Sequence, residues 1–107
     1  MQSQLSVLTP RYISEELRIE TKARDIEVSM EILNRILSHG GRFRVRHMNK
    51  GQQLPIRKVN GVVYQLTRRG VLNRTIGNSR GDYYLVVDGD SIANDWYTLQ
   101  RELNNYR

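Results

Sequence analysis

The stretch that decides the fold is residues 54–87, LPIRKVNGVVYQLTRRGVLNRTIGNSRGDYYLVV. Pro55 suits the first turn of a helix, because the amide that proline lacks has no intrahelical partner there. Apolar residues then recur at helical spacing, and Gly70 follows them. These apolar positions are Val59, Val63 and Leu66. The pattern predicts an amphipathic helix that ends at a glycine.

The second half of the stretch predicts a two-stranded hairpin. Residues 71–76 and 83–87 are rich in apolar side chains and flank a polar tip bounded by glycines. Upstream, Gly40 and Gly41 are expected to end an earlier helix, because glycine adopts the left-handed conformation that closes a helix terminus. Residues 42–48 lie between that helix and the stretch described above.

This order of elements resembles the winged helix-turn-helix family of bacterial and phage DNA-binding regulators. The resemblance covers residues 26–87 and is most telling at 66–72, LTRRGVL, which in that family closes the third helix and enters the wing. The chain departs from the family where 42–48 alternates as a strand would and Gly51 interrupts early. The resemblance implies a mainly α fold with a small β-hairpin, a winged helix-turn-helix with additional N- and C-terminal helices.

A small barrel of five strands is the rival structure. Asn60 and Gly61 lie between apolar residues, which is the strongest short signal for a tight hairpin turn. Pro55 and the helical spacing favour the winged helix. Gly61 costs a helix about 1 kcal/mol relative to alanine, so it indicates a need for space or, in the barrel, a turn.

The first forty residues predict a flexible arm and a long helix. Residues 1–11 are irregular, and Ser14 can cap a helix that runs to residue 38. Such a helix would span about 37 Å, and its first half would project from the domain. A break near Asp25 would instead give two short helices, and both alternatives stay open. The apolar stripe is Ile19, Ala23, Ile26, Met30, Leu33 and Leu37.

The C-terminal segment predicts a second amphipathic helix, capped by Asp90 or Ser91. We therefore expect an arm (1–11), a winged-helix domain that includes the long helix (12–90) and a C-terminal helix (91–107). The two apolar seams can pack within one chain or across a two-fold axis, and we expect a homodimer. The candidate dimer residues are Ile19, Ala23, Ile26, Trp96, Leu99, Leu103 and Tyr106.

Positive charge is concentrated in one window of the sequence. Ten lysines and arginines and no acidic residue lie between Gly41 and Asp82, whereas the segments before and after carry about −1 and −3 of the net +6. A phosphate backbone is the natural partner of such a surface. A solvated basic face that keeps the protein soluble is the alternative.

The predicted third helix and wing carry the residue types that contact DNA. Arginine can donate two hydrogen bonds to guanine, and Asn or Gln can pair with adenine. The polar tip of the wing suits phosphate or minor-groove contact. The candidate DNA contacts are Arg44, Arg46, Arg57, Lys58, Asn60, Gly61, Tyr64, Gln65, Arg68, Arg74, Asn78, Ser79 and Arg80.

Several other classes of protein find little support. The sequence has no cysteine, no apolar run long enough to cross a membrane and no secretion signal. His39 and His47 lack the spacing of a helical metal pair, and residues 88–91 resemble only half of a calcium loop. We therefore expect no catalysis, no cofactor and no metal.

The sequence thus predicts a cytoplasmic, dimeric protein that binds specific double-stranded DNA as a transcriptional regulator, with repression as the expected mode of action. A protein-interaction module with the same fold is the first alternative, and an RNA-binding small barrel is the second.

Overall fold

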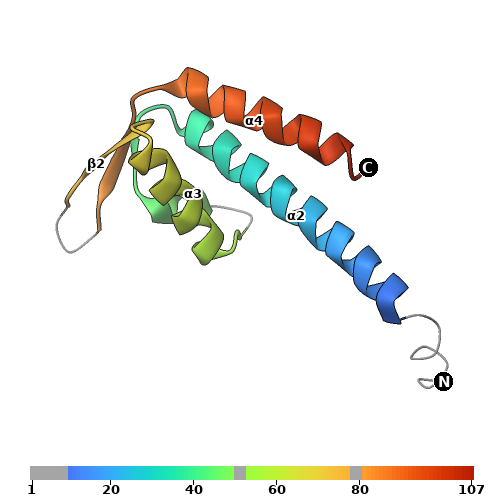
Figure 1. Ribbon diagram of the computed structural model, residues 1–107. Coiled ribbons are helices and arrows are strands. Elements are labelled where there is room, and N and C mark those ends of the chain that lie inside the picture. Colours follow the sequence, from blue (N-terminus) through green and yellow to red (C-terminus); the bar gives the residue numbers. More distant parts are fainter. Residues whose placement is uncertain (1–9, 50–52, 78–80) are drawn as a thin grey trace.

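The computed structural model describes residues 10–49, 53–77 and 81–107. It confirms a mainly helical chain with a small antiparallel sheet (Figure 1). The elements, in chain order, are α2 (Pro10–His39), β1 (Arg42–Phe43), the 3₁₀ helix η1 (Val45–Asn49), α3 (Ile56–Arg68), β2 (Leu72–Thr75), β3 (Tyr83–Val86) and α4 (Gly89–Asn104).

The sheet has the order β1-β3-β2, and both pairs of strands are antiparallel. Phe43 in β1 and Arg74 in β2 both lie opposite Tyr84 in β3. The strand-like alternation at 42–48 therefore has a structural counterpart, because its first two residues join the hairpin as a third strand. The rest of that segment forms η1, which makes the second helix of the motif a short 3₁₀ helix.

Helix α3 excludes the five-stranded barrel, because the Asn60-Gly61 pair lies inside a helix and not at a turn. The backbone amide of Val59 donates to the carbonyl of Pro55 at 3.1 Å, which begins the helix where the proline predicted. At the other end, Gly70 has a φ of +78°, and the amide of Val71 donates to the carbonyl of Leu66 at 2.9 Å. The predicted glycine terminus is therefore confirmed.

Helix α2 is continuous from Pro10, which decides between the two alternatives in favour of one long helix and against a break near Asp25. Its 30 residues correspond to about 45 Å at 1.5 Å per residue. The helix begins at Pro10, four residues earlier than predicted, because a proline is tolerated in the first turn. Ser14 therefore lies within the helix rather than before it. Of the expected arm, residues 1–9 lie outside the described residues.

Helix α4 runs back along α2 in the antiparallel direction, and its start differs slightly from the prediction (Figure 1). The cap is Asp88, whose carboxylate accepts from the amide of Ser91 at 3.1 Å and from the Ser91 hydroxyl at 2.7 Å. These hydrogen bonds hold the pKa of Asp88 below its usual value. Among the described residues, no helix has both the length and the hydrophobicity that a bilayer crossing needs.

The contact between α2 and α4 corrects the expected dimer seam. Ala23 and Ile26 are buried within the chain, because α4 covers this part of α2. The guanidinium of Arg107 bonds Glu27 at 3.0 Å and so holds the end of α4 against α2. On α4, the seam residues Trp96, Leu99, Leu103 and Tyr106 are half-buried. Ile19, beyond the end of α4, remains exposed.

The core lies where α2, α3, η1, the sheet and the start of α4 meet. Its largest fully buried side chains are Phe43, Ile32, Ile36, Met48, Leu72, Ile92, Val59 and Val63. Because they come from every part of the motif, packing around them fixes the position of α3 relative to the wing.

We expect Ile36→Ala to lower the free energy of unfolding by about 2–5 kcal/mol, because it removes a fully buried side chain and leaves a cavity. Urea denaturation followed by circular dichroism measures this loss. Ile76→Ala is the matched control: Ile76 is exposed next to the hairpin tip, so its removal should change stability by less than about 0.5 kcal/mol.

Candidate nucleic-acid interface

One side of α3 is buried and the other carries most of the predicted contacts. Val59, Val63 and Leu66 face the core, so helical geometry turns the polar residues outward. Lys58 is half-buried, and the exposed residues of the predicted set are Arg57, Asn60, Gly61, Tyr64, Gln65 and Arg68.

The exposed side of α3 is divided into two flanks by the elements beside it. Toward the wing, a groove of about 380 Å³ is lined by Asn60, Tyr64 and Arg68 together with Arg74. Toward α2 and α4, a second groove of about 500 Å³ includes Gly61 in its wall. The sequence predicted one surface on α3, whereas the fold gives it two different neighbours. The second groove is also lined by Arg57, Lys58 and Gln65.

Arg74 is held along the wing by an acidic neighbour. Its Nε donates to Asp82 Oδ2 at 2.6 Å, and Asp82 Oδ1 accepts from the amide of Gly77 at 3.2 Å. The Gly77 amide and then the Arg74 guanidinium lower the pKa of Asp82. The hydrogen bond to Asp82, together with its negative charge, raises the pKa of Arg74. The predicted contacts Asn78, Ser79 and Arg80 lie outside the described residues.

Arg44 lies inside the molecule and is therefore removed from the candidate surface. Only 6% of the residue is exposed, and its guanidinium sits 3.9 Å from the centre of the Tyr83 ring and donates to the Tyr83 hydroxyl. The neighbouring Arg42, at 4.7 Å from the same ring, stays exposed. A run of alternating arginines in the sequence could not show which of them the sheet would bury.

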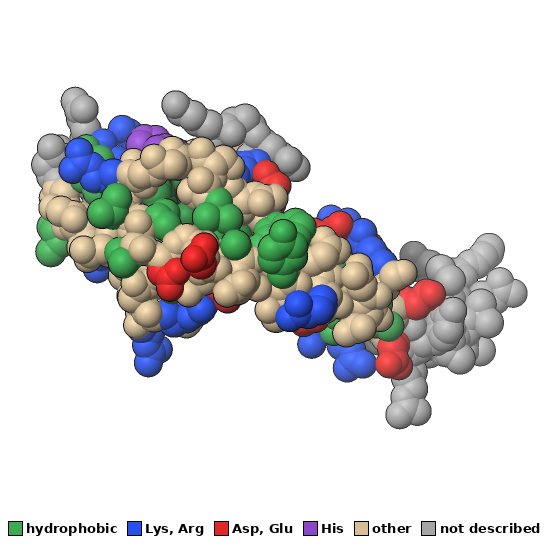
Figure 2. Space-filling model, turned by 90° about the horizontal axis from the view of Figure 1, so that it is seen from above, with side chains coloured by type: hydrophobic (Ala, Val, Ile, Leu, Met, Phe, Trp, Pro, Cys, Tyr) green, Lys and Arg blue, Asp and Glu red, His purple; other side chains and the backbone are tan. Residues whose placement is uncertain are grey.

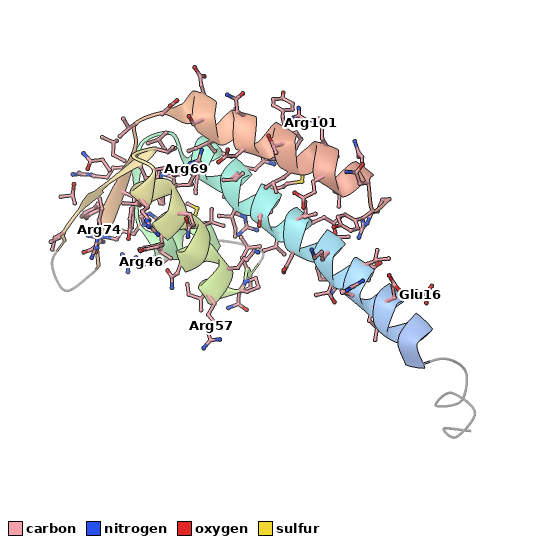
Figure 3. The ribbon with its side chains drawn as sticks, viewed as in Figure 1. Glu16, Arg46, Arg57, Arg69, Arg74 and Arg101 are labelled. Carbon is pink, nitrogen blue, oxygen red and sulfur yellow. The ribbon has the colours of Figure 1, made fainter. Side chains whose placement is uncertain are left out.

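The remaining cations lie on different parts of the surface. Figure 3 shows Arg57 pointing away from the body of the molecule at the free end of α3, while Arg46 and Arg74 lie toward the wing. Arg46 is exposed on η1. Arg101 lies on α4, away from these three side chains (Figure 3). Arg46, Arg57 and Arg74 thus lie around α3, whereas Arg101 lies on α4 (Figure 3).

A clamp between α3 and α4 was missed by sequence reasoning. Arg69 NH1 and NH2 donate to the two oxygens of Asp95 at 2.6 and 3.3 Å, and Asp95 raises the pKa of Arg69. The pair joins the end of α3 to α4 across 26 positions of sequence, and no local pattern signals a contact at that separation.

The two histidines contact each other. The rings of His39 and His47 stack with centroids 5.2 Å apart, and His47 Nδ1 accepts from the backbone amide of Arg44 at 3.0 Å. Within the described part of the chain, no group of three or more histidine or acidic side chains is arranged to hold a metal ion.

Comparison with known proteins gives one distant likeness of shape. No protein-family model matches this sequence, and no curated protein matches it. Among solved structures, it is similar to a MarR family protein from Bacillus stearothermophilus, with 16% identity and a TM-score of 0.46 over 98% of this chain and 80% of that one. The winged-helix description therefore rests on the element order and the sheet register of this chain.

The Asp82 pair predicts a pH dependence at the wing. Because folding lowers the pKa of Asp82, its contribution to stability is present above the unfolded value of about 3.9 and is lost as the pH falls through the folded value. We expect the urea midpoint of the wild type to fall more between pH 5 and pH 2 than that of Asp82→Asn. Glu102→Gln, at an exposed position on α4, is the control and should follow the wild type. If the urea midpoint of Asp82→Asn fell as much as that of the wild type, the prediction would be contradicted.

Proposed function

We propose that this protein binds specific sequences of double-stranded DNA and acts in the cytoplasm as a transcriptional regulator, most simply a repressor. The observation that supports this is the exposed face of α3 beside the wing, where Arg74 lines the groove between them. In a winged helix-turn-helix, such a helix can enter the major groove while the wing reaches the adjacent backbone. Occupying an operator would block polymerase without any further activity.

The flank of α3 that faces the wing is the part suited to base contacts. Asn60, Tyr64 and Arg68 are four residues apart, so they form one line along the helix. The Asn60 amide matches the pattern of donor and acceptor on adenine, and the Arg68 guanidinium matches guanine. Arg57, near the start of the same helix, lines the other flank, beside the groove toward α2 and α4.

The cations around that line are suited to phosphate. Arg46 on η1 and Arg74 on β2 are exposed, and Asp82 orders the guanidinium of Arg74. Contacts of this kind fix the position of the protein on the duplex and carry no sequence information. The proposed functional unit is a homodimer, in which two α3 helices would lie about 34–36 Å apart, one turn of DNA.

A protein-interaction module is the second candidate, and one observation favours it. The groove between α3 and the pair α2 and α4 has an apolar floor, which a phosphate backbone does not need. The RNA-binding barrel is no longer a candidate, because α3 is helical.

A gel-shift titration in rising salt tests DNA binding. A protein that neutralises about six phosphates should lose affinity with a slope near −5 in log affinity against log salt. The probe is a pool of random duplexes, which also yields the preferred site after selection. A response that is flat in salt would reject DNA binding and favour the interaction module.

Arg68→Ala tests base readout by α3. If its guanidinium pairs with a base, the variant should lose about 1–3 kcal/mol on the preferred site and should relax selectivity at a single position. Arg101→Ala on α4 is the matched control and should bind like the wild type. Unchanged selectivity in Arg68→Ala would remove this residue from the base-reading set.

A further inference from the structure

The groove between α3, α2 and α4 has chemistry that suits an apolar partner with negative charge. Its volume is about 500 Å³. Leu33 of α2, Leu66 of α3 and Leu99 of α4 contribute apolar side chains. Arg57 brings positive charge, and so does Lys58, whose ammonium lies 4.0 Å from Asp25. An occupant that buries apolar surface and places carboxylates beside these cations would therefore fit both features.

Gly61 stands in the wall of this groove, and the chain itself gives no steric reason for a glycine there. A Cβ built on Gly61 would meet no atom within 4 Å, although glycine costs the middle of a helix about 1 kcal/mol. Arg57, Gly61 and Gln65 are four residues apart and line the same flank. The glycine therefore leaves space for something that approaches the backbone of α3 from outside this chain.

The first turns of α2 are the second surface without a cover among the described residues. Residues 15–22 are all exposed. Helix α4 ends at Asn104, and the Arg107 guanidinium beyond it reaches Glu20 at 3.5 Å, so the α2 turns before Glu20 extend past α4 (Figure 1). Leu17 is 62% exposed and Ile19 is 40% exposed.

This projecting end of α2, residues 15–22, carries apolar and acidic side chains on adjoining positions. Glu16 and Glu20 are one helical turn apart, and with Leu17 and Ile19 they line a shallow hollow beside the helix. Figure 3 shows Glu16 on the side of α2 that α4 covers further along. The end therefore offers apolar side chains that suit the apolar floor of the groove and two carboxylates that suit its cations, although Glu20 also contacts Arg107 of its own chain.

We propose that the projecting end of α2 in one copy of this chain packs into the α3–α4 groove of a second copy, and the reverse. Leu17 and Ile19 meet the apolar floor, Glu16 and Glu20 lie beside the cationic side chains, and Gly61 permits the close approach. The end cannot fold back into the groove of its own chain, because α2 is one continuous rod that points away from it (Figure 1).

This pairing rests on the proposed dimer and goes beyond it, because it assigns the two flanks of α3 to different partners. The flank with Gly61 and Gln65 contacts the second copy, whereas the flank with Asn60 and Arg68 remains open to a duplex. The two assignments are tested separately, since dimer formation is measured without DNA.

Charge reversal with complementation tests the pairing. One variant carries Glu16→Lys and Glu20→Lys, and the other carries Arg57→Glu and Gln65→Glu. In a homodimer of either variant, the projecting end and the groove would carry like charges at both of the two equivalent contacts. We therefore expect each variant to form an at least tenfold weaker dimer, measured by sedimentation equilibrium. An equimolar mixture joins opposite charges at both contacts and should form a one-to-one heterodimer with nearly wild-type affinity.

Gly61→Leu tests the need for space on the same flank. Leucine favours the helix and meets no atom of its own chain at the Cβ, so the chain should stay folded while the dimer is lost. Asn60→Leu, on the flank toward the wing, is the matched control and should remain dimeric. Circular dichroism shows that each variant keeps its helices.

Three results would overturn the proposal: a monomeric wild type at 100 µM, variants that dimerise like the wild type, or a mixture that stays monomeric. The salt-dependent gel shift of the wild type is independent of all three. A dimer that persists in both charge variants would place the two-fold contact on another surface and would leave the proposed DNA binding untouched.

Discussion

The burial of one side of α3 against α2, η1 and β2 is the interaction on which the rest of the structure depends. Val59, Val63 and Leu66 are nearly inaccessible to solvent, so α3 cannot rotate about its axis without exposing them. This constraint presents the polar side of α3 to solvent. It also sets the wing beside the helix, because β2 follows directly from the glycine turn.

Helix α2 has two halves with different physical roles. Its C-terminal half supplies Ile32 and Ile36 to the core and carries α4 along its length. Its first turns extend past α4 and keep apolar side chains in water. Figure 2 shows the same division, with a broad body at one end and a narrower extension at the other. The core of one chain needs only part of α2, so the first turns remain available for the proposed contact with a second copy.

The basic window is divided by the fold into internal and external cations. Arg44 is buried beneath the Tyr83 ring, Arg69 is clamped by Asp95 and Arg74 is ordered by Asp82. Carboxylates from outside the window thus pair with three of its members, because Lys58 also lies 4.0 Å from Asp25. Arg46 on η1 and Arg57 and Arg68 on α3 are exposed and can meet a polyanion. Arg74 also reaches the surface of the wing, where Asp82 orders its guanidinium.

The sequence alone determined the order of the elements, the helical character of 56–68 and the glycine that ends it, because these follow from local periodicity and from the backbone freedom of single residues. It left the barrel and a broken α2 open, since Asn-Gly and Asp25 are valid local signals that packing overrode. Only the tertiary structure decided that Ala23 is covered by α4, that Arg44 is internal and that α3 has two flanks. These depend on contacts between residues far apart in the chain, whose partners no local pattern specifies.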